Sequence, residues 1–460
     1  MIKTAIVGGG YVGLVSGACF AALGADVTIV EADRRRFDAL QAGRIPIYEP
    51  GLEDLVARHR AGGQLRFVEA IDGAINGVDA VFLAVGTPSR RGDGHADLTY
   101  VLDAVDQIAT ALTGPCVLVT KSTVPVGTGA RIAAMMRTLR PDVDIEIASN
   151  PEFLREGSAI GDFMKPDRVV IGCDSGSARA RAVLEALYQP LVAKGVKLLF
   201  TGLETAELTK YAANSFLAMK ISFINEMADI CERVGADVME LAHGMGLDQR
   251  NGPQFLRPGP GFGGSCFPKD TQALVRIAQD VGAPTRLIES VVAVNEARKA
   301  AVTSRIIAAC GGSVRGKRIA VLGLTFKPDT DDMRDAPSIG MIHRLVDEGA
   351  SVSAYDPMGM DYARFHLPAK VTYCEDAAGA IAEADAVVLI TEWAEFRAIL
   401  PADLCAAMRG RIIVDLRNAF DPVAMRLAGM TYHGIGQPLP DSIGEFSRPV
   451  PAPDRIASVG

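Results

Sequence analysis

Residues 1–31 decide the fold class, and they read MIKTAIVGGGYVGLVSGACFAALGADVTIVE. The segment 2–7 is short and mostly apolar, which predicts a buried strand. Three glycines follow it, then a helical stretch from Tyr11 to Leu23 and a second apolar strand from Val27 to Val30. This order of strand, glycine turn, helix and strand is typical of a βαβ unit in a parallel sheet.

The glycine turn, Gly8-Gly-Gly10-Tyr-Val-Gly13, matches the pattern GxGxxG in the context that the pattern requires, after a strand and at the start of a helix. The first glycine permits a tight turn, the second lets the backbone approach a pyrophosphate, and the third lets helix and strand pack closely. The phosphates would then meet free amides at the helix N-terminus. We therefore predict a dinucleotide site here.

Glu31 ends the second strand, about 20 residues after the motif. A carboxylate at that position accepts hydrogen bonds from ribose hydroxyls and repels a 2′-phosphate, which favours NAD over NADP. Arg34, Arg35 and Arg36 follow it, and arginines are also the residues that would hold a 2′-phosphate. We therefore expect NAD as the cofactor, although the three arginines favour NADP.

The alternation of strands and helices continues along the chain. Further strands are predicted at Ala80–Val85, Val117–Thr120 and Ile145–Ala148, and helices between them at Leu98–Leu112 and Gly129–Leu139. A second strand series is predicted at Lys317–Leu322, Val352–Tyr355, Ala386–Ile390 and Ile412–Asp415. Between the two series, Thr205 to Val234 contains neither glycine nor proline and predicts one long helix. Gly244 to Asp270 is rich in both, and we predict a loop throughout.

The length of 460 residues suggests roughly three domains. The patterns predict two Rossmann-like doubly wound parallel-sheet domains joined by a long central helix. The boundaries are 1–200, 201–300 for the central helical region with the cysteine loop, 315–436, and a proline-rich tail at 437–460 that we expect to run over the surface or to be disordered.

Composition excludes several classes of protein. The net charge is −8, aromatic residues make up 6% and there is one tryptophan, so neither non-specific nucleic-acid binding nor a base-stacking surface is expected. No apolar run is long enough for a membrane helix, and the early glycines do not fit a signal peptide, so we expect a cytoplasmic protein. Eight sparse cysteines without a CxxC pair favour reduced thiols over disulfides or a metal site.

One cysteine lies in a different setting from the others, in Gly261-Phe-Gly-Gly-Ser-Cys266-Phe-Pro-Lys269-Asp270. Small neighbours allow access to the thiol, and a nearby lysine would lower its pKa. From the residues alone, a nucleophile and a structural cysteine both stay open. Core positions are predicted instead for Cys19, Cys116, Cys231 and Cys405.

Polar residues gather at several predicted strand ends. Glu152 and Glu156 are four residues apart and would share a face if their turn is helical, and Lys210 and Asn214 have the same spacing on the long helix. Lys121-Ser-Thr123 follows another strand, where open α/β sheets bind ligands. Each of these features alone also fits a solvated face or a turn cap.

Together these motifs resemble the UDP-glucose/GDP-mannose dehydrogenase family over about residues 1–435. The segments that carry the resemblance are Gly8–Gly13, Lys121–Gly127, Asn150–Gly157, Lys210–Asn214, Gly261–Asp270 and Lys327–Pro337. The family oxidises the primary alcohol of a sugar nucleotide to a carboxylate with two NAD and without release of the aldehyde.

The resemblance implies a role for each matched residue. Cys266 would be the nucleophile that forms a thiohemiacetal and then a thioester. Lys210 and Asn214 would stabilise the oxyanions, Asp270 with Thr123 would activate water, and Glu152 would support acid–base steps. Arg250 would reach the substrate of a neighbouring subunit, which implies a homodimer or a higher homo-oligomer.

The binding residues implied by the resemblance form two sets. The cofactor would be held by Gly8, Gly10, Tyr11, Val12, Gly13, Glu31, Arg36, Gly86, Thr87, Thr123, Glu156, Lys269 and Arg334. The substrate would contact Glu152, Phe153, Leu154, Arg155, Lys210, Asn214, Arg250, Phe255, Arg257, Phe262, Gly263, Phe326, Lys327 and Arg417. No metal is expected.

Alternatives concern the substrate and the class of protein. Phe267 after the cysteine favours family members that convert UDP-glucose to UDP-glucuronate, and the same chemistry on GDP-mannose or a UDP-N-acetylhexosamine is the alternative. A non-catalytic NAD-binding protein would lack Cys266, Lys210 or Asp270, and all three are present. A one-step hydroxy-acid dehydrogenase would need no cysteine. The pathway that uses the product, such as polysaccharide biosynthesis, is open.

Overall fold

The computed structural model describes residues 1–88, 90 and 94–438, and the predicted tail lies almost wholly outside them. The chain divides into two compact units. Unit 1 comprises residues 1–216, 265–292 and 328–331, and unit 2 comprises residues 217–264, 293–327 and the chain from 332 onward.

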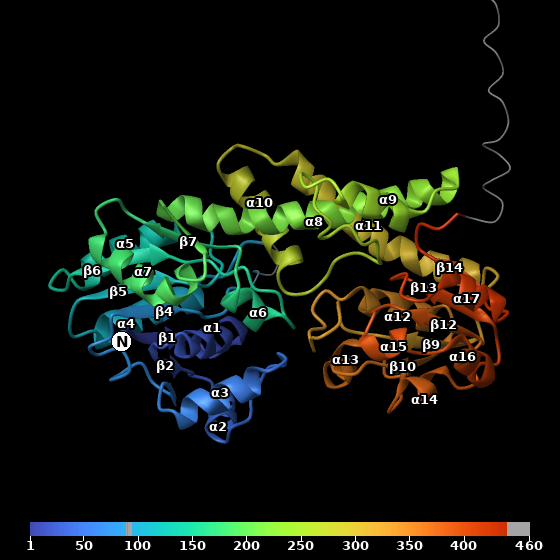
Figure 1. Ribbon diagram of the computed structural model, residues 1–460, viewed down its shortest axis with the longest axis horizontal. Helices are drawn as coiled ribbons and strands as arrows, with labels where there is room; N and C mark the ends of the chain where they lie inside the picture. The colour runs from blue at the N-terminus through green and yellow to red at the C-terminus, as the bar shows by residue number, and fades with distance from the viewer. Residues whose placement is uncertain (89, 91–93, 439–460) are drawn as a thin grey trace, which may run out of the picture. The chain divides into compact units, whose positions relative to one another are not determined.

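Unit 1 is built on one sheet (Figure 1). Its strands are β1 (Lys3–Val7), β2 (Asp26–Val30), β3 (Leu65–Val68), β4 (Ala80–Leu83), β5 (Cys116–Thr120), β6 (Ile145–Ser149), β7 (Arg168–Cys173) and β8 (Lys197–Thr201), in the order β3-β2-β1-β4-β5-β6-β7-β8. The first six strands are parallel and have the order of a dinucleotide-binding sheet, which confirms the predicted fold class.

One strand pair departs from the predicted parallel arrangement, because β7 runs antiparallel to β6. The connection between them contains only the short helix α6 (Ala159–Met164). The chain makes no long helical crossover of the sheet at this point. The next strand therefore starts at the edge where β6 ended.

Alternate residues of each strand face opposite sides of this sheet, and both sides are covered by helices. Ile6 and Ile29 join the apolar cluster under α1 (Tyr11–Ala22), whereas Ala5 and Val81 join the cluster under α4 (Thr99–Ala111). The other helices of unit 1 are α2 (Arg34–Gln41), α3 (Leu52–Ala61), α5 (Thr128–Leu139), α7 (Ala178–Val192) and α10 (Phe267–Asp280).

Unit 2 contains a second sheet of the same order, β11-β10-β9-β12-β13-β14, with every pair parallel, and it is coloured orange to red in Figure 1. The strands are β9 (Arg318–Leu322), β10 (Ser351–Tyr355), β11 (Thr372–Tyr373), β12 (Ala386–Leu389), β13 (Ile412–Asp415) and β14 (Thr431–Gly434). The helices are α9 (Val238–Gly246), α12 (Pro337–Asp347), α13 (Met360–His366), α14 (Ala377–Ile381), α15 (Ala394–Arg397), α16 (Pro401–Ala407) and α17 (Pro422–Leu427).

Two long helices continue along the chain from one unit into the other. They are α8 (Leu203–Val234), which confirms the predicted central helix, and α11 (Arg286–Ala309). The loop predicted from Gly244 to Asp270 is wrong at both ends, because α9 ends at Gly246 and α10 begins at Phe267. Pro268 fits the first turn of α10, since the amide it lacks would have no partner there.

The eight cysteines are all free thiols. Cys19, Cys116 and Cys231 are buried, as predicted for core residues. The prediction is wrong for Cys405, which is only partly buried on α16, where its thiol donates to the Ala428 carbonyl oxygen at 3.2 Å.

Candidate active site

The glycine turn after β1 has the geometry that its motif predicts. Gly8 has a φ of +111°, and a Cβ there would lie 2.5 Å from the carbonyl oxygen of Ala84. A Cβ at Gly13 would lie 1.9 Å from the Gly8 oxygen, whereas at Gly10 the nearest atom would be Arg36 Nη1 at 3.9 Å. The protein's own packing thus requires glycine at 8 and 13 but not at 10, and the open space at Gly10 fits the approach of a pyrophosphate.

Glu31 directly follows β2 and is buried beside this turn. Its Oε1 accepts a hydrogen bond from the Asp33 N–H at 2.8 Å, and a Cβ at Gly9 would lie 2.7 Å from its Oε2. Arg34 already pairs with two acidic side chains, Asp38 and Glu69. The carboxylate is therefore placed beside the predicted phosphate site, and one of the three arginines is committed elsewhere.

Tyr11 and Val12 form the first turn of α1, and both are partly buried. The Tyr11 hydroxyl donates to the buried carboxylate of Glu49, which also accepts the Gly157 N–H at 2.6 Å and the Ala159 N–H at 2.7 Å. Burial and the adjacent carboxylate raise the pKa of Tyr11, so its hydroxyl stays protonated. This network fixes the turn after Glu156 against the start of α1.

Polar side chains meet where β4 and β5 end. Thr87, next to Gly86, donates from its hydroxyl to the Thr123 carbonyl oxygen at 2.8 Å. Lys269 Nζ donates to the Thr87 hydroxyl at 3.4 Å. Residues predicted to bind the cofactor thus come together from two strands and from α10 at the carboxyl edge of the sheet.

Lys210 and Glu152 form a buried ion pair. Lys210 Nζ donates to Glu152 Oε1 at 2.8 Å, and their side chains are 3% and 7% exposed. Burial is the largest single effect and disfavours both charges, but the opposing Coulomb and hydrogen-bond contributions together outweigh it, so the pKa of Glu152 is lowered and that of Lys210 is raised. The Leu154 N–H also donates to Glu152, at 2.7 Å. Both side chains stay charged at neutral pH.

A second polar pair lies one turn further along α8. Asn214 Nδ2 donates to Asp270 Oδ2 at 2.6 Å, and Asp270 is 1% exposed. Its Oδ1 lies 3.3 Å from Lys269 Nζ. Asp270 is in the first turn of α10, where the helix dipole favours a carboxylate. Lys210 and Asn214 share one buried face of α8, as their spacing predicts.

Cys266 precedes the first residue of α10 and is partly exposed. Burial and the nearby Glu152 carboxylate raise the pKa of its thiol to about 11, although the Lys210 ammonium acts in the opposite direction. The prediction that a lysine beside it in the sequence would lower this pKa is therefore wrong, because Lys269 pairs with Asp270 instead. The free thiol is protonated at neutral pH.

The segment 150–157 is not helical, so Glu152 and Glu156 do not share a helix face as their spacing suggested. Glu152 pairs with Lys210, whereas Glu156 accepts from the Ser265 hydroxyl at 3.0 Å and from the Thr330 hydroxyl at 3.2 Å. Sequence reasoning missed Ser265. Its position immediately before the candidate nucleophile was the available signal.

Lys121 was also missed as a polar core residue. It is 3% exposed, and its Nζ donates to Asn150 Oδ1 at 3.1 Å. Burial lowers its pKa to about 8, while the nearby Glu152 acts in the opposite direction and Lys210 lowers it further. A lysine directly after an apolar strand was the signal for a buried cation.

The side chains that follow Glu152 have protein partners. The Phe153 ring lies 3.8 Å from the Arg168 guanidinium and 5.6 Å from Lys210 Nζ. Leu154 packs against the core under α1, and Arg155 forms an ion pair with Asp162 at 2.6 Å. Their predicted substrate contacts stay predictions.

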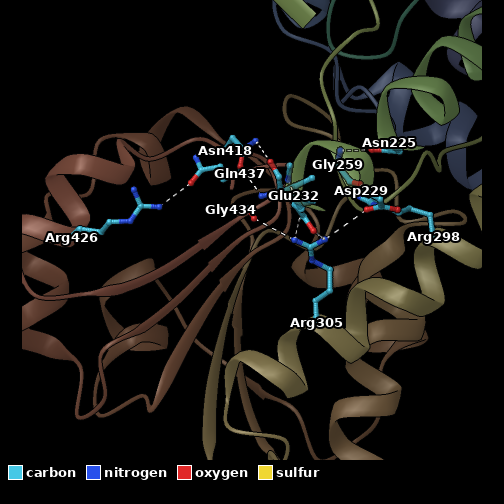
Figure 2. Close-up of polar contacts among 12 residues, drawn as sticks. Asn225, Asp229, Glu232, Gly259, Arg298, Arg305, Asn418, Arg426, Gly434 and Gln437 are labelled. Atoms are coloured by element: carbon cyan, nitrogen blue, oxygen red, sulfur yellow. Dashed lines mark hydrogen bonds and ion pairs between the residues drawn. The ribbon is translucent and has the colours of Figure 1, made fainter. Parts of the chain in front are cut away.

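In unit 2, buried side chains of α8 and α11 hold the backbone of the predicted substrate loop, residues 255–263. Asn225 accepts the Gly259 N–H at 2.8 Å, and Arg298 donates to the Gly259 carbonyl oxygen at 3.2 Å (Figure 2). Asn295 accepts the Phe262 N–H at 2.8 Å and donates to the Phe262 carbonyl oxygen at 3.1 Å.

Ion pairs tie the same two helices together. Arg298 pairs with Asp229, and Arg305 pairs with Glu232 at 2.5 Å, as Figure 2 shows. Glu232 also accepts the Gly436 N–H at 2.6 Å, after the last strand of the second sheet. Charge-assisted hydrogen bonds therefore connect α8, α11 and the end of the second sheet beneath the loop.

The loop packs closely on the carboxyl edge of the second sheet. Arg417 Nη2 donates to the Phe326 carbonyl oxygen at 3.0 Å. A Cβ at Gly259 would lie 2.8 Å from Arg417 Nη1, and one at Gly263 would lie 2.4 Å from the Asp335 carbonyl oxygen. These glycines let predicted substrate residues from separate segments assemble.

Other predicted substrate and cofactor residues of unit 2 lie at its surface or under strain. Phe255 has a φ of +63°, an unfavourable conformation for a bulky residue that is typical of functional sites. Arg257 is exposed, and Arg250 is 89% exposed. Lys327 Nζ lies 5.8 Å from an aromatic ring centroid, and Arg334 pairs with Asp332 at 2.8 Å. Their roles stay predictions.

The geometry of unit 1 suits covalent chemistry on a carbonyl group. It combines the thiol of a partly exposed cysteine with an ammonium and an amide on one helix face, and carboxylates accompany both. A cation and an amide donor can stabilise an oxyanion, and the carboxylates can transfer protons.

Comparison with known proteins gives matches along most of the chain. Three consecutive regions match models of the UDP-glucose/GDP-mannose dehydrogenase family: its NAD binding domain at residues 2–192, its central domain at 204–297 and its UDP binding domain at 320–422.

Individual relatives and solved structures agree with this match. A UDP-glucose 6-dehydrogenase of Rhizobium meliloti is 54% identical over 95% of this chain and 100% of its own. One of Bacillus subtilis is 46% identical over 95% of this chain and 94% of its own. The structure of a UDP-glucose dehydrogenase from Pyrobaculum islandicum superposes with a TM-score of 0.86 at 38% identity, covering 95% of this chain and 98% of that one. In the described part of the chain, no helix is long and apolar enough to cross a membrane.

Proposed function

This chain belongs to the UDP-glucose/GDP-mannose dehydrogenase family, and from that premise we propose that it oxidises UDP-glucose to UDP-glucuronate in two NAD-dependent steps. It is an NAD-dependent sugar-nucleotide dehydrogenase. The choice of UDP-glucose rests on relatives of that activity at up to 54% identity. The covalent mechanism is carried by one observation, the partly exposed Cys266 beside the buried Lys210–Glu152 pair.

The residues at the glycine turn fit NAD, because Gly10 leaves open space where a pyrophosphate would lie and Glu31 is buried beside the turn, where its carboxylate would accept from the ribose hydroxyls. When bound, NAD accepts a hydride from the carbon under oxidation. Lys269, Glu156 and Arg334 would hold other parts of the cofactor. Residues 1–200 form the NAD-binding part in this proposal.

Cys266 supplies the bond that keeps the aldehyde on the enzyme. Its sulfur adds to the aldehyde carbon and gives a thiohemiacetal, and oxidation of that adduct leaves a thioester on the same sulfur. The Lys210 ammonium and the Asn214 amide donate hydrogen bonds to the oxyanion. Two buried donors one helical turn apart do not need to reorganise when the charge develops.

Hydrolysis of the thioester requires a water molecule and a proton acceptor. Asp270 is a buried acidic side chain in the first turn of α10, and together with Thr123 it would position the water. Glu152 would move the proton and Lys210 would again stabilise the oxyanion. The products are the free thiol and UDP-glucuronate.

The sugar nucleotide would be held mainly by residues 315–436 and by the loop of the central region, 201–300. Arg417 already lies against both Phe326 and Gly259, so a substrate would meet a preformed surface. Lys327, Arg257 and the loop residues Phe255 to Gly263 complete the set.

We propose that the chain acts as a homodimer or a higher homo-oligomer. In unit 2, α8 exposes Phe223, Ile230 and Val234, which are 41%, 50% and 45% exposed and spaced by seven and four residues. This apolar stripe at helical spacing suits packing against a second copy of the helix. The Arg250 side chain is 89% exposed although it pairs with Asp248, and it would reach that copy. Ile230→Glu should yield monomers in light scattering.

A cytoplasmic location is part of the proposal. All eight cysteines are free, and such thiols persist in a reducing compartment.

The decisive experiment measures NADH formed per molecule of sugar nucleotide, with UDP-glucose, GDP-mannose and a UDP-N-acetylhexosamine in parallel. Two NADH per UDP-glucose are expected. One NADH would mean that the reaction stops at the aldehyde, and Cys266 would lose its role. Activity with GDP-mannose or the N-acetylhexosamine alone would replace the proposed substrate.

A further inference from the structure

The Cys266 thiol has to lose its proton when it attacks, and the charged groups around it are already engaged. Burial and the neighbouring Glu152 raise its pKa to about 11. Of the charged side chains that act on it, Lys210 and Glu152 pair with each other, and Asp270 is bound by Asn214. In the described part of the chain, the only hydrogen bond of the thiol is with Ser265, at 3.5 Å.

Ser265 connects the thiol to a separate carboxylate. Its hydroxyl lies 3.5 Å from Cys266 Sγ and 3.0 Å from Glu156 Oε1. A hydroxyl can donate and accept at the same time, so the three groups form a continuous path for a proton. We propose that Ser265 and Glu156 form a relay that takes the proton from the Cys266 thiol as its sulfur attacks the aldehyde.

The sulfur–carbon bond forms while the S–H bond breaks, and the thiol proton moves to the Ser265 oxygen. The Ser265 proton moves to Glu156 Oε1, and the carbonyl electron pair moves to the oxygen held by Lys210 and Asn214. When hydrolysis later expels the thiolate, Glu156 returns the proton through Ser265. No group outside the chain and the substrate is needed.

The carboxylate is held in place for this role. Thr330 donates to its second oxygen, Oε2, at 3.2 Å, while Ser265 donates to Oε1. The next residue, Gly157, turns the chain with a φ of +77°, and its N–H donates to the buried Glu49 at 2.6 Å. A Cβ at Gly157 would lie 2.2 Å from the Asp329 carbonyl oxygen, so the turn is tightly packed.

The relay makes a prediction about pH. An unassisted thiol reacts only as thiolate, so its rate of alkylation rises tenfold per pH unit below its pKa. With a carboxylate acting through Ser265, the rate is nearly flat between the titrations of the carboxyl and the thiol. The test is the rate at which iodoacetamide labels Cys266 in the full chain between pH 6 and 9. Peptide mass spectrometry separates this label from the seven other cysteines.

In Ser265→Ala and Glu156→Gln, we expect the flat profile to be replaced by a tenfold rise per pH unit, with labelling about a hundredfold slower at pH 7. Ser265→Thr keeps the hydroxyl and should keep the profile. Ser16→Ala is the matched control, because it removes a buried hydroxyl of α1 that has no hydrogen-bond partner in the described part of the chain.

Three results would overturn the relay. They are a tenfold rise per pH unit in the unaltered chain, a flat profile that survives in Ser265→Ala, and faster labelling in Glu156→Gln, which would mean that the carboxylate only repels the thiolate. The inference rests on the nucleophilic role in the proposed function. Labelling needs neither NAD nor UDP-glucose, so the relay and the substrate can fail independently.

Discussion

Replacing Lys210 by methionine removes one partner of a buried ion pair and the main cation at the site. The pair is 2.8 Å long, and its side chains are 3% and 7% exposed, so Glu152 would be left charged and buried. Breaking such a pair costs about 3–5 kcal/mol of unfolding free energy. We expect the lower part of this range for unit 1, because the buried Lys121 still lowers the pKa of Glu152.

The same change should reduce kcat by about 10²–10³, the usual cost of losing an oxyanion donor. The double variant Lys210→Met with Glu152→Gln separates the two effects. It removes the unpaired charge, so most of the stability should return, whereas activity should not. Urea unfolding and NADH production measure the two quantities on the same preparations.

The pH dependence has a defined sign. In the unaltered chain the pKa of Glu152 is lowered, so the pair stabilises the fold above the unfolded value of about 4.3 and this contribution is lost as the pH falls through the folded value. In Lys210→Met, burial raises the pKa of Glu152, so the deficit is large at pH 8 and shrinks toward pH 5. A deficit below about 1 kcal/mol at pH 8 would refute the reasoning, since that is the range of an exposed pair. Recovery of turnover in the double variant would refute the catalytic part.

Three further variants test other parts of the site. Cys266→Ser should bind UDP-glucose, measured by calorimetry, but lose net NADH production, and full two-step turnover in it would exclude the covalent mechanism. Gly10→Ala should be as stable as the unaltered chain, because its Cβ would meet only Arg36 at 3.9 Å. It should nevertheless bind NAD at least tenfold more weakly in a fluorescence titration. An unchanged affinity would place the cofactor elsewhere. Asn295→Ala removes two hydrogen bonds to Phe262, so KM for UDP-glucose should rise about tenfold with a smaller change in kcat, and a fall in kcat alone would contradict the positioning role.

The fold was largely predictable, because its signals are local. Alternating apolar strands and helices can be recognised from neighbouring residues alone. The stretch from 205 to 234 contains neither glycine nor proline, so it predicts a helix unambiguously. The errors fall where local signals compete. Glycine and proline around Cys266 predicted a loop, but Pro268 is also a favourable residue for the first turn of a helix. The reversal of β7 is a property of its pairing with β6, which no strand pattern reveals.

The charge states of the site were not predictable, because they depend on residues far apart in the sequence. Lys210 meets Glu152 across 58 positions, and Ser265 meets Glu156 across 109. Sequence proximity suggested Lys269 as the cation that activates the thiol, but that lysine turns to Asp270.

By itself, the sequence determined the glycine turn, the two strand series and the central helix, since each is a property of a few adjacent residues, and it marked Cys266 as a candidate nucleophile. Only the tertiary structure decided which carboxylate pairs with which cation, that the thiol is protonated, and that Ser265 links it to Glu156. The physical reason is that burial and Coulomb interactions depend on distances in space, and these are set only when the strands and helices pack together.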